Sequence, residues 1–536
     1  MNRNMLLAFI LAVGFYTVWL KWIEHKYPNA GRHAKPAVAQ TAAQEPRKPQ
    51  AMAAAPAPES KPAAAPAKAK LLSQDEIQAQ AAASDAPESV RDAIPFSAGN
   101  ANILFNPDGA GIASFQYRGP VATAELIPHS QPGFFSTMPG LVFTVKERTE
   151  DRITFQARLD RDVTVEKTFG WSAGEGLNTL EITARNASKT PYSLPEWGIW
   201  LGPGLDTVAS EKKENHSLLK AAFTVVQEGR KHPVVNTLPK HEPDGPWLWA
   251  GVYNRYFLAA VLPQQWDSHA IKFTEIKEKK NKLPAITLSQ PAATLAPGES
   301  RTWKTGFYFG PKDYRKLQAL GNGLDRSVEF GFFAPLGKLV MSVLYYFHKV
   351  TGNYGWSIVL LTVLIQLALF PLTLKSTKAN VLMRKLQPEL KEIQTRYKSN
   401  PQKLNEEMLA LYRRHGANPL GGCLPMLLQI PVFFALFTAL RNSWDLHGAP
   451  FTLWIHDLSS KDPYYVLPLL MGAIMFLQQR RSAMPGADPM QQMMMQWMPV
   501  IFTFMFLNFP SGLVLYWLLS SVVGFFVQIE LQKKYA

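Results

Sequence analysis

The chain is poor in cysteine: its 536 residues contain a single one, Cys423. One thiol cannot form a disulfide within the chain, so the fold must be held together without one. A C-x-x-C redox motif and a zinc site built from several cysteines are excluded for the same reason.

The motifs of several common enzyme classes are also missing. The sequence contains no H-E-x-x-H, no G-x-x-x-x-G-K-[ST], and no G-x-G-x-x-G between a strand and a helix, which argues against the usual zinc-protease, phosphate-binding and dinucleotide sites. His447, His456 and Asp457 lie close together in the sequence, but such a group more often forms local hydrogen bonds than a catalytic or metal site. We predict that the protein is not an enzyme and that it uses no catalytic residue, no metal and no cofactor.

Acidic residues are outnumbered, because 56 Lys and Arg stand against 41 Asp and Glu, for a formal net charge of +15. The excess is concentrated between residues 375 and 418, where ten basic residues accompany four acidic ones. Basic loops beside apolar segments stay in the cytoplasm, so we interpret the charge as a topology signal. We expect no direct nucleic-acid partner.

Long apolar runs are confined to the two ends of the chain. Residues 1–30 contain a run long enough to cross a bilayer, followed by Trp19, Trp22 and Tyr27, which resemble interface anchors. No A-x-A site closes this run, so we predict an uncleaved signal-anchor helix. Residues 31–94 are rich in Ala and Pro, cannot bury a core, and are predicted to be a disordered tether.

Between residues 95 and 320, short β-rich runs alternate with turn residues. ILFNPDGAGIASFQYRG and VTVEKTFGW are typical stretches, and no helix-length amphipathic run interrupts them as far as Pro311. The pattern predicts a large antiparallel β-sandwich. By the charge argument this domain lies outside the cytoplasm, whereas both termini lie inside.

The remainder of the chain alternates apolar runs with basic loops. Apolar residues at three- and four-residue spacing predict an amphipathic helix on the membrane surface within residues 325–352. Five apolar runs within 353–536 predict five spans, which makes six with the anchor. Two apolar stripes flank Ser399-Asn400-Pro401 and predict a cytoplasmic helical hairpin over residues 375–418. The fold class is therefore a multi-domain membrane protein, a β-sandwich joined to an α-helical transmembrane bundle.

Two of the predicted spans are short. Residues 464–477 and 494–509 would be about 21 Å and about 24 Å long as helices, against a hydrocarbon core of about 30 Å. Short spans favour local thinning of the bilayer, which lowers the cost of moving a polar segment across it.

Four stretches carry a family resemblance: NYGWSIVLLTVLIQLALFPLT, NPLGGCLPMLLQIPVFFALF, APFTLWIHDLSSKDPYYVLPLLMG and DPMQQMMMQWMPVIFTFMFLNFPSGLVLYW. Over residues 330–535 the chain resembles the YidC/Oxa/Alb membrane-protein insertase family, and its anchor, tether and β-domain are similar to the Gram-negative form. The resemblance implies a periplasmic β-supersandwich and a five-helix insertase core in the inner membrane. It also implies that the protein moves and folds nascent membrane proteins through a hydrophilic groove open to cytoplasm and lipid.

The implied partners are nascent membrane proteins, the Sec translocon with its accessory subunits, and membrane lipids. The ribosome and the signal-recognition targeting machinery are further candidates, and the family works alone on small clients and with the translocon on others. Two other functions stay open from the residues, a small-solute transporter and a membrane-anchored periplasmic chaperone or binding module. The spans show no inverted repeat and no intramembrane carboxylate for ion coupling, which weighs against the transporter.

Polar side chains inside the predicted spans are the candidate site residues. The family usually carries a positively charged residue, most often Arg, where this chain has Gln366. Because hydrocarbon satisfies neither amides nor hydroxyls, we expect a hydrated groove in contact with the client, lined by Gln366, Thr362, Gln429, Ser521 and Gln528. The alternative is that these side chains hydrogen-bond neighbouring helices and hold the bundle together.

Apolar side chains in the same spans are candidates for the surface on which a client segment slides. The resemblance implies that the spans 420–440 and 494–509 contact the client. We assign this slide to Phe433, Phe434, Met471, Met505 and Phe506, and flexible Met side chains suit varied partners. Ordinary packing against lipid or core is the alternative for each of them.

Overall fold

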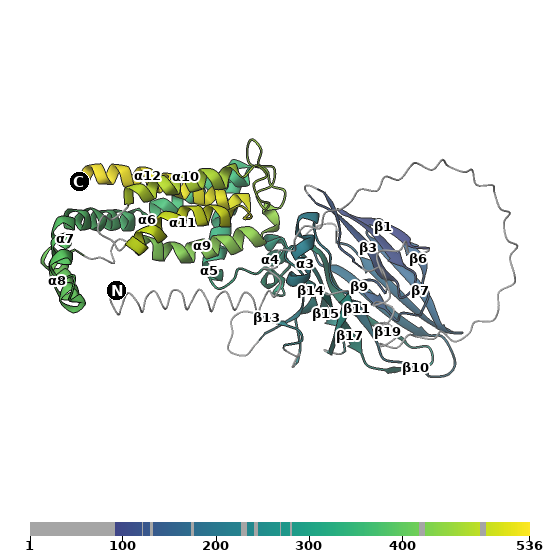
Figure 1. The fold of residues 1–536 in the computed structure, drawn as a ribbon. Helices are drawn as coiled ribbons and strands as arrows, with labels where there is room; N and C mark the ends of the chain where they lie inside the picture. Colours follow the sequence, from purple (N-terminus) through teal and green to yellow (C-terminus); the bar gives the residue numbers. More distant parts are fainter. Residues whose placement is uncertain are drawn as a thin grey trace, which may run out of the picture.

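The computed structural model describes residues 92–535, apart from the segments 120–121, 129–131, 173–175, 227–232, 241–244, 268–269, 279–280, 418–423 and 483–488. The predicted anchor over residues 1–30 and nearly all of the predicted tether over 31–94 lie outside the described residues. The strands gather at one end of the described chain and the helices at the other (Figure 1).

A nine-stranded sheet forms the centre of the N-terminal domain, and all of its neighbouring strands are antiparallel. In spatial order its strands are β13 (Val234–Thr237), β12 (Lys220–Val225), β14 (Trp249–Tyr253), β15 (Phe257–Gln265), β19 (Ser300–Pro311), β9 (Asn178–Asn186), β8 (Val163–Gly170), β7 (Arg152–Asp160) and β6 (Thr144–Arg148).

Smaller sheets pack against this sheet and complete the sandwich. They consist of β1 (Ile94–Ala98), β2 (Ala101–Asn106), β3 (Gly111–Arg118) and β4 (Thr123–Glu125); of β16 (Ile271–Glu278), β17 (Asn281–Gln290), β11 (Trp197–Leu201) and β5 (Ser136–Thr137); and of the pair β10 (Tyr192–Leu194) and β18 (Ala293–Leu295). Phe115 of β3 stacks on Phe309 of β19 with ring centroids 4.2 Å apart. Trp197 of β11 meets Trp303 of β19 edge-on at 5.1 Å. The predicted β-rich domain is confirmed, and its sheets are antiparallel.

Strand β8 shows how the alternating pattern is used. Its residues alternate between buried and half-buried, as a period of two requires. Lys167 occupies a buried position, and its Nζ donates to the carbonyl oxygens of Gly109, Ala110 and Phe135 at 3.0, 2.9 and 2.5 Å. These bonds use all three N–H groups of the ammonium and tie β8 to the segments before β3 and β5. Burial lowers the pKa of Lys167 well below its ordinary value.

Short helices lie where the sandwich meets the rest of the chain. They are α3 (Lys212–Leu218), α4 (Tyr314–Leu320) and the 3-10 helices Ala209–Glu211 and Leu324–Ser327. The sequence did not predict α3, which has only seven residues, too few for an amphipathic stripe to be recognised.

The C-terminal helices are α5 (Ala334–Thr351), α6 (Tyr354–Lys385), α9 (Leu424–Asn442), α10 (Val466–Ser482), α11 (Pro489–Phe506) and α12 (Ser511–Tyr535). Among the described residues, α6 and α12 are long and apolar enough to cross a membrane, and α9 and α11 contain shorter apolar segments, Leu428–Asn442 and Gln496–Phe506. The predicted helical bundle is therefore present with two clear spans, and the total of six stays a prediction.

Helix α6 is longer than the sequence indicated. It begins behind Asn353, whose Oδ1 accepts from the backbone N–H groups of Gly355 and Trp356 at 2.8 and 3.2 Å, the arrangement of an N-cap. It continues to Lys385, so the first part of the predicted hairpin over 375–418 belongs to α6 instead. The boundary was missed because a run of helix-forming polar residues after the apolar segment contains no Gly or Pro.

The hairpin itself consists of α7 (Gln387–Arg396) and α8 (Pro401–Arg414), beyond the end of α6 (Figure 1). Asn400 caps α8 by accepting from the backbone N–H of Lys403 at 3.2 Å, and Pro401 takes the first helical position, as predicted.

Helix α5 has the two faces that the sequence predicted. Val340 and Leu344 are among its buried residues, whereas Leu339 and Tyr346 are 58% and 65% exposed. Its buried face packs on α6 and α9. The exposed apolar side chains suit contact with lipid.

The loop that follows α9 is packed into the β-domain. Trp444, in the 3-10 helix Trp444–Leu446, belongs to the hydrophobic core of the sandwich, where its ring centroid lies 5.9 Å from that of Tyr117 and 5.1 Å from that of Phe257. Arg441, at the end of α9, forms an ion pair with Glu214 of α3 at 3.0 Å. The sandwich and the helices are thus joined by an apolar plug and an ion pair.

Candidate functional site

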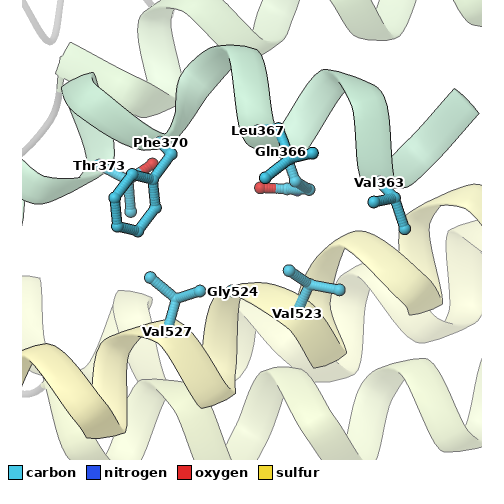
Figure 2. Close-up of a pocket in the computed structure, with 8 residues that line it drawn as sticks. All are labelled: Val363, Gln366, Leu367, Phe370, Thr373, Val523, Gly524 and Val527. Atoms are coloured by element: carbon cyan, nitrogen blue, oxygen red, sulfur yellow. The ribbon is translucent and has the colours of Figure 1, made fainter.

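A cavity of about 140 Å³ lies between α6 and α12, the two helices that are clearly long enough to span a membrane. Its lining consists of Val363, Gln366, Leu367, Phe370 and Thr373 from α6 and Val523, Gly524 and Val527 from α12 (Figure 2). Glycine at position 524 lets the α12 backbone lie at the cavity wall. The lining is mostly apolar, with polar side chains only on the α6 side.

Gln366 is the polar group that the sequence predicted at this place. Its side chain lies in the gap between the two helices, across from Val523 (Figure 2), and it is half-buried. Its amide forms no hydrogen bond to any residue that the structure describes. A primary amide that is held among apolar side chains without a partner costs free energy, so the amide requires water or a passing polar group.

Thr362 and Ser521 are placed differently from the prediction. Thr362 is fully buried, and its hydroxyl donates to the carbonyl oxygen of Ile358 at 2.7 Å, within its own helix. Ser521 is 8% exposed and lies outside the cavity lining. Neither hydroxyl faces the space next to Gln366.

Gln429 connects two helices. Its Nε2 donates to the hydroxyl of Tyr516, a fully buried residue of α12, at 2.7 Å. Interhelical bonds of this kind stabilise membrane bundles, which is the alternative role that the sequence left open. Gln528 is half-buried further along α12 and does not line the cavity.

The candidate slide residues fall into two groups. Met471 and Phe506 are completely buried in the bundle core. Phe433 and Phe434 are half-buried, and the ring of Phe433 contacts that of Trp517 edge-on with centroids 5.1 Å apart. Met505 is 43% exposed. In this conformation Met505 is accessible from outside the bundle, whereas Met471 and Phe506 are not.

The interior of the bundle is electrically neutral. The sequence contains no Asp, Glu, Lys, Arg or His in residues 354–374, 424–440, 466–479, 489–506 or 511–529. The first charge beyond the cavity along α6 is Lys375, which is exposed. The described residues also contain no group of three or more His, Cys, Asp or Glu that could hold a metal ion.

The His-Asp group in the loop after α9 forms local hydrogen bonds. Asp457 accepts from the backbone N–H of Gly448 and from the hydroxyl of Ser459 at 3.0 and 2.7 Å. His447 lies 3.3 Å from the same hydroxyl through Nδ1 and 4.0 Å from Asp457. Because the carboxylate binds the serine directly, the histidine does not stand between them as a general base would. Burial lowers the pKa of His447, which favours the neutral ring.

Most of the cavity lining was missed from the sequence. On α6 the lining recurs at positions 363, 366, 367, 370 and 373, the three- and four-residue spacing of one helical face. This spacing on either side of Gln366 could have been recognised in the sequence. The prediction already assigned the last helix to this groove through Ser521 and Gln528, but it chose the wrong face of that helix. The face that lines the cavity carries Val523 and Val527, four residues apart.

Two family models match this chain, one after the other. The model described as "YidC periplasmic domain" matches residues 104–343, and the model described as "60Kd inner membrane protein" matches residues 346–536. The boundary between them falls within α5, close to the joint between the sandwich and the helices.

Curated relatives cover most of the chain. A protein of Endomicrobium trichonymphae named "Membrane protein insertase YidC" is 41% identical over 419 residues, which is 76% of this chain and 78% of the relative. A protein of the same name from Geobacter sulfurreducens is 39% identical over 391 residues, or 73% of this chain and 72% of the relative. A solved structure described as an active YidC insertase with its first transmembrane domain resolved aligns with 85% of this chain and 96% of its own, at 17% identity and a TM-score of 0.37.

Proposed function

The chain belongs to the YidC membrane protein insertase family, and from this premise we propose that it inserts nascent membrane proteins into the inner membrane and assists their folding. The observation that supports a site for this work is the unbonded amide of Gln366 in the cavity between α6 and α12. A polar group that is kept inside a spanning bundle offers a passing segment a partner where lipid offers none.

The physical task is to lower a barrier, with no bond made or broken. A charged side chain at the centre of a bilayer costs roughly 2.5–3.5 kcal/mol on insertion scales, and an unpaired amide costs roughly 1–3 kcal/mol on the scale of protein mutations. Hydrogen bonds to water and to the amide in a recess next to Gln366 would offset part of these two free-energy costs. Helix α10, with 17 residues, would be about 26 Å long, shorter than a hydrocarbon core of about 30 Å, which supports local thinning of the bilayer.

The proposed orientation rests on charge. The ten basic residues between 375 and 418 favour a cytoplasmic hairpin, and the sandwich, at the opposite end of the helices (Figure 1), would then lie in the periplasm. Six spans, cytoplasmic termini, and cooperation with the Sec translocon, the ribosome and the targeting machinery are parts of the proposal that the family membership favours.

Reconstitution tests the function. The purified chain in liposomes is expected to increase protease-protected insertion of a single-span client over that in empty liposomes. Gln366→Leu, which removes the amide and keeps a similar volume, is expected to reduce insertion several-fold, whereas Gln366→Asn retains most of it. Equal yields with and without the protein would contradict the proposal, and full activity of the Leu variant would remove Gln366 from it.

Crosslinking tests the slide residues with a control that is built into the chain. Met505 and Phe506 are neighbours on α11, but the first is exposed and the second is buried. A photo-reactive residue at 505 is expected to capture a stalled client. Capture at 506 or 471 as well would indicate that the bundle opens during insertion, and capture at none of them would contradict the slide.

A further inference from the structure

The polar groups at the cavity wall are all uncharged. Gln366 offers two N–H donors and one carbonyl acceptor. The hydroxyl of Thr373 is already used, because it donates to the carbonyl oxygen of Leu369 at 3.1 Å. Pro371 lies inside α6 and has no N–H, so the helix supplies no donor to the carbonyl of Leu367 four residues earlier. That carbonyl belongs to a lining residue and lacks its usual helical donor, so it is a candidate second acceptor of the wall.

No charged side chain lies at the cavity wall or in the apolar segments around it. All other lining side chains are aliphatic or aromatic, and the membrane-embedded parts of the bundle contain no ionisable Asp, Glu, Lys, Arg or His. Lys375 lies nine positions beyond Gln366 and is exposed. That offset corresponds to about 13 Å along a helix, so a group bound at the Gln366 amide does not contact this ammonium. The cavity therefore has no charged side chain of its own with which to prefer an acidic segment over a basic one.

A set of two donors and two acceptors matches the groups that a polypeptide presents when its helix is not yet formed. A peptide group has one donor and one acceptor, and Ser, Thr, Asn and Gln side chains have both kinds. The amide can also turn its donors to a carboxylate or its carbonyl to an ammonium with similar geometry. The wall satisfies any of these groups without selecting their charge.

We propose that the cavity between α6 and α12 is a contact site for uncharged polar groups of the client, namely peptide groups and hydroxyl or amide side chains, and that it accepts translocated segments regardless of the sign of their charge. The proposal rests on the proposed insertase function and specifies the class of client segment that the site takes.

The test uses the full chain in liposomes without an imposed membrane potential, because a potential would itself select charge. Three clients differ at one position of the translocated tail, which carries Asp, Asn or Lys. Insertion into empty liposomes is subtracted, and the readout is the ratio of Asp-tail to Lys-tail insertion rather than the absolute yield. The same ratio is measured for Gln366→Arg, Gln366→Glu and Gln366→Asn. Gln479→Arg, which adds the same charge beside Arg480 outside the cavity lining, is the matched control.

For the native chain, Gln366→Asn and Gln479→Arg, the expected ratio lies within threefold of one. Gln366→Arg is expected to raise it at least fivefold and Gln366→Glu to lower it at least fivefold. A native ratio more than threefold from one, or a ratio that neither charged variant at 366 changes, would overturn the inference while leaving the insertase function intact. Failure to insert any of the three clients above the level of empty liposomes would instead refute the proposed function, and this inference with it.

Discussion

Lys312 is a buried lysine that directly follows β19, at the end of the sandwich that meets the helices. It is 3% exposed, and its Nζ donates to the carbonyl oxygen of Asn254 at 2.7 Å. Its pKa is lowered to about 7, mainly by burial and also by the charges of Lys220 and Arg255, whereas Glu329 opposes the shift. Tyr253 faces the ammonium with its ring at 4.6 Å, and burial raises the pKa of its phenol well above its ordinary value, so Tyr253 stays neutral.

The lowered pKa of Lys312 predicts a pH dependence of stability. Between pH 7 and 10 the unfolded chain holds a proton on this lysine that the folded chain has released, so raising the pH favours the folded state. The slope from one such group is at most about 1.4 kcal/mol per pH unit. Lys312→Met is expected to reduce the slope measured by denaturation of the full chain in detergent, with Lys167 providing a remaining part.

Lys277→Met, on the exposed edge strand β16, controls for the loss of a positive charge. If the Lys312→Met variant and the native chain show the same slope from pH 7 to 10, Lys312 is not the group that titrates.

Residue identities predicted the polar candidates but not their partners. Gln366 could be selected because a lone amide in an apolar run stands out, and the structure brings it to the cavity. Thr362 and Gln429 look the same in the sequence, yet one bonds its own helix and the other bonds Tyr516. Which partner a polar side chain takes depends on distances between helices, and a periodic pattern carries no information about these distances.

At the scale of elements, α10 and α11 approach each other closely at Gly472. A Cβ built on Gly472 would lie 2.0 Å from the hydroxyl oxygen and 3.2 Å from the Cβ of Thr503. The hydroxyl is fixed, because it donates to the carbonyl oxygen of Pro499 at 2.7 Å. Small residues at such crossings allow helix backbones to pack closely in a membrane.

Gly472→Ala is therefore expected to destabilise the bundle by about 1–3 kcal/mol, the usual range for overpacking, seen as a lower thermal midpoint in detergent. Thr503→Ala removes the clashing oxygen, so the double variant is expected to regain most of that loss. A loss in the double variant equal to the sum of the two single losses would contradict the contact.

Element types were easier to predict than element ends. The hairpin and the amphipathic α5 follow from periodicity and the apolar helices follow from hydropathy, and both are local properties. The end of α6 was placed eleven residues too early, at 374 instead of 385, because hydropathy reports where lipid contact ends and the backbone hydrogen bonds continue beyond that point. Short α3 was missed for the opposite reason, since seven residues give too little pattern.

At the scale of the whole molecule, the joint between the sandwich and the bundle combines apolar and polar contacts. Trp444 fills part of the sandwich core, Thr438 of α9 donates to the carbonyl oxygen of Phe330 at 2.8 Å, and Asn442 donates to that of Glu329 at 2.7 Å. Tyr345 of α5 donates to Asp445 at 2.7 Å. None of these pairs could be predicted, because each joins segments about a hundred residues or more apart.

Deletion of residues 95–311 distinguishes an insertase from an anchored periplasmic binding module. An insertase is expected to keep most of its activity in the remaining helices, measured by reconstituted insertion, whereas an anchored periplasmic binding module would lose it. Trp444→Ala is the accompanying control: it is expected to cost about 3–5 kcal/mol of stability in the full chain, the usual range for a buried Trp, and almost nothing in the truncated one. Equal costs in both chains would show that Trp444 is not held by the sandwich.

Only two residues separate Arg441, at the end of α9, from Trp444. This short connection acts as a spacer of fixed length, because the guanidinium must reach Glu214 while the indole enters the core of the sandwich. With one inserted residue, Arg441 and Trp444 could no longer both reach their contacts on the sandwich, whereas the sandwich and the bundle would each stay intact. The length of this connection must therefore be preserved, and changing it offers a way to uncouple the outer domain without removing a single side chain.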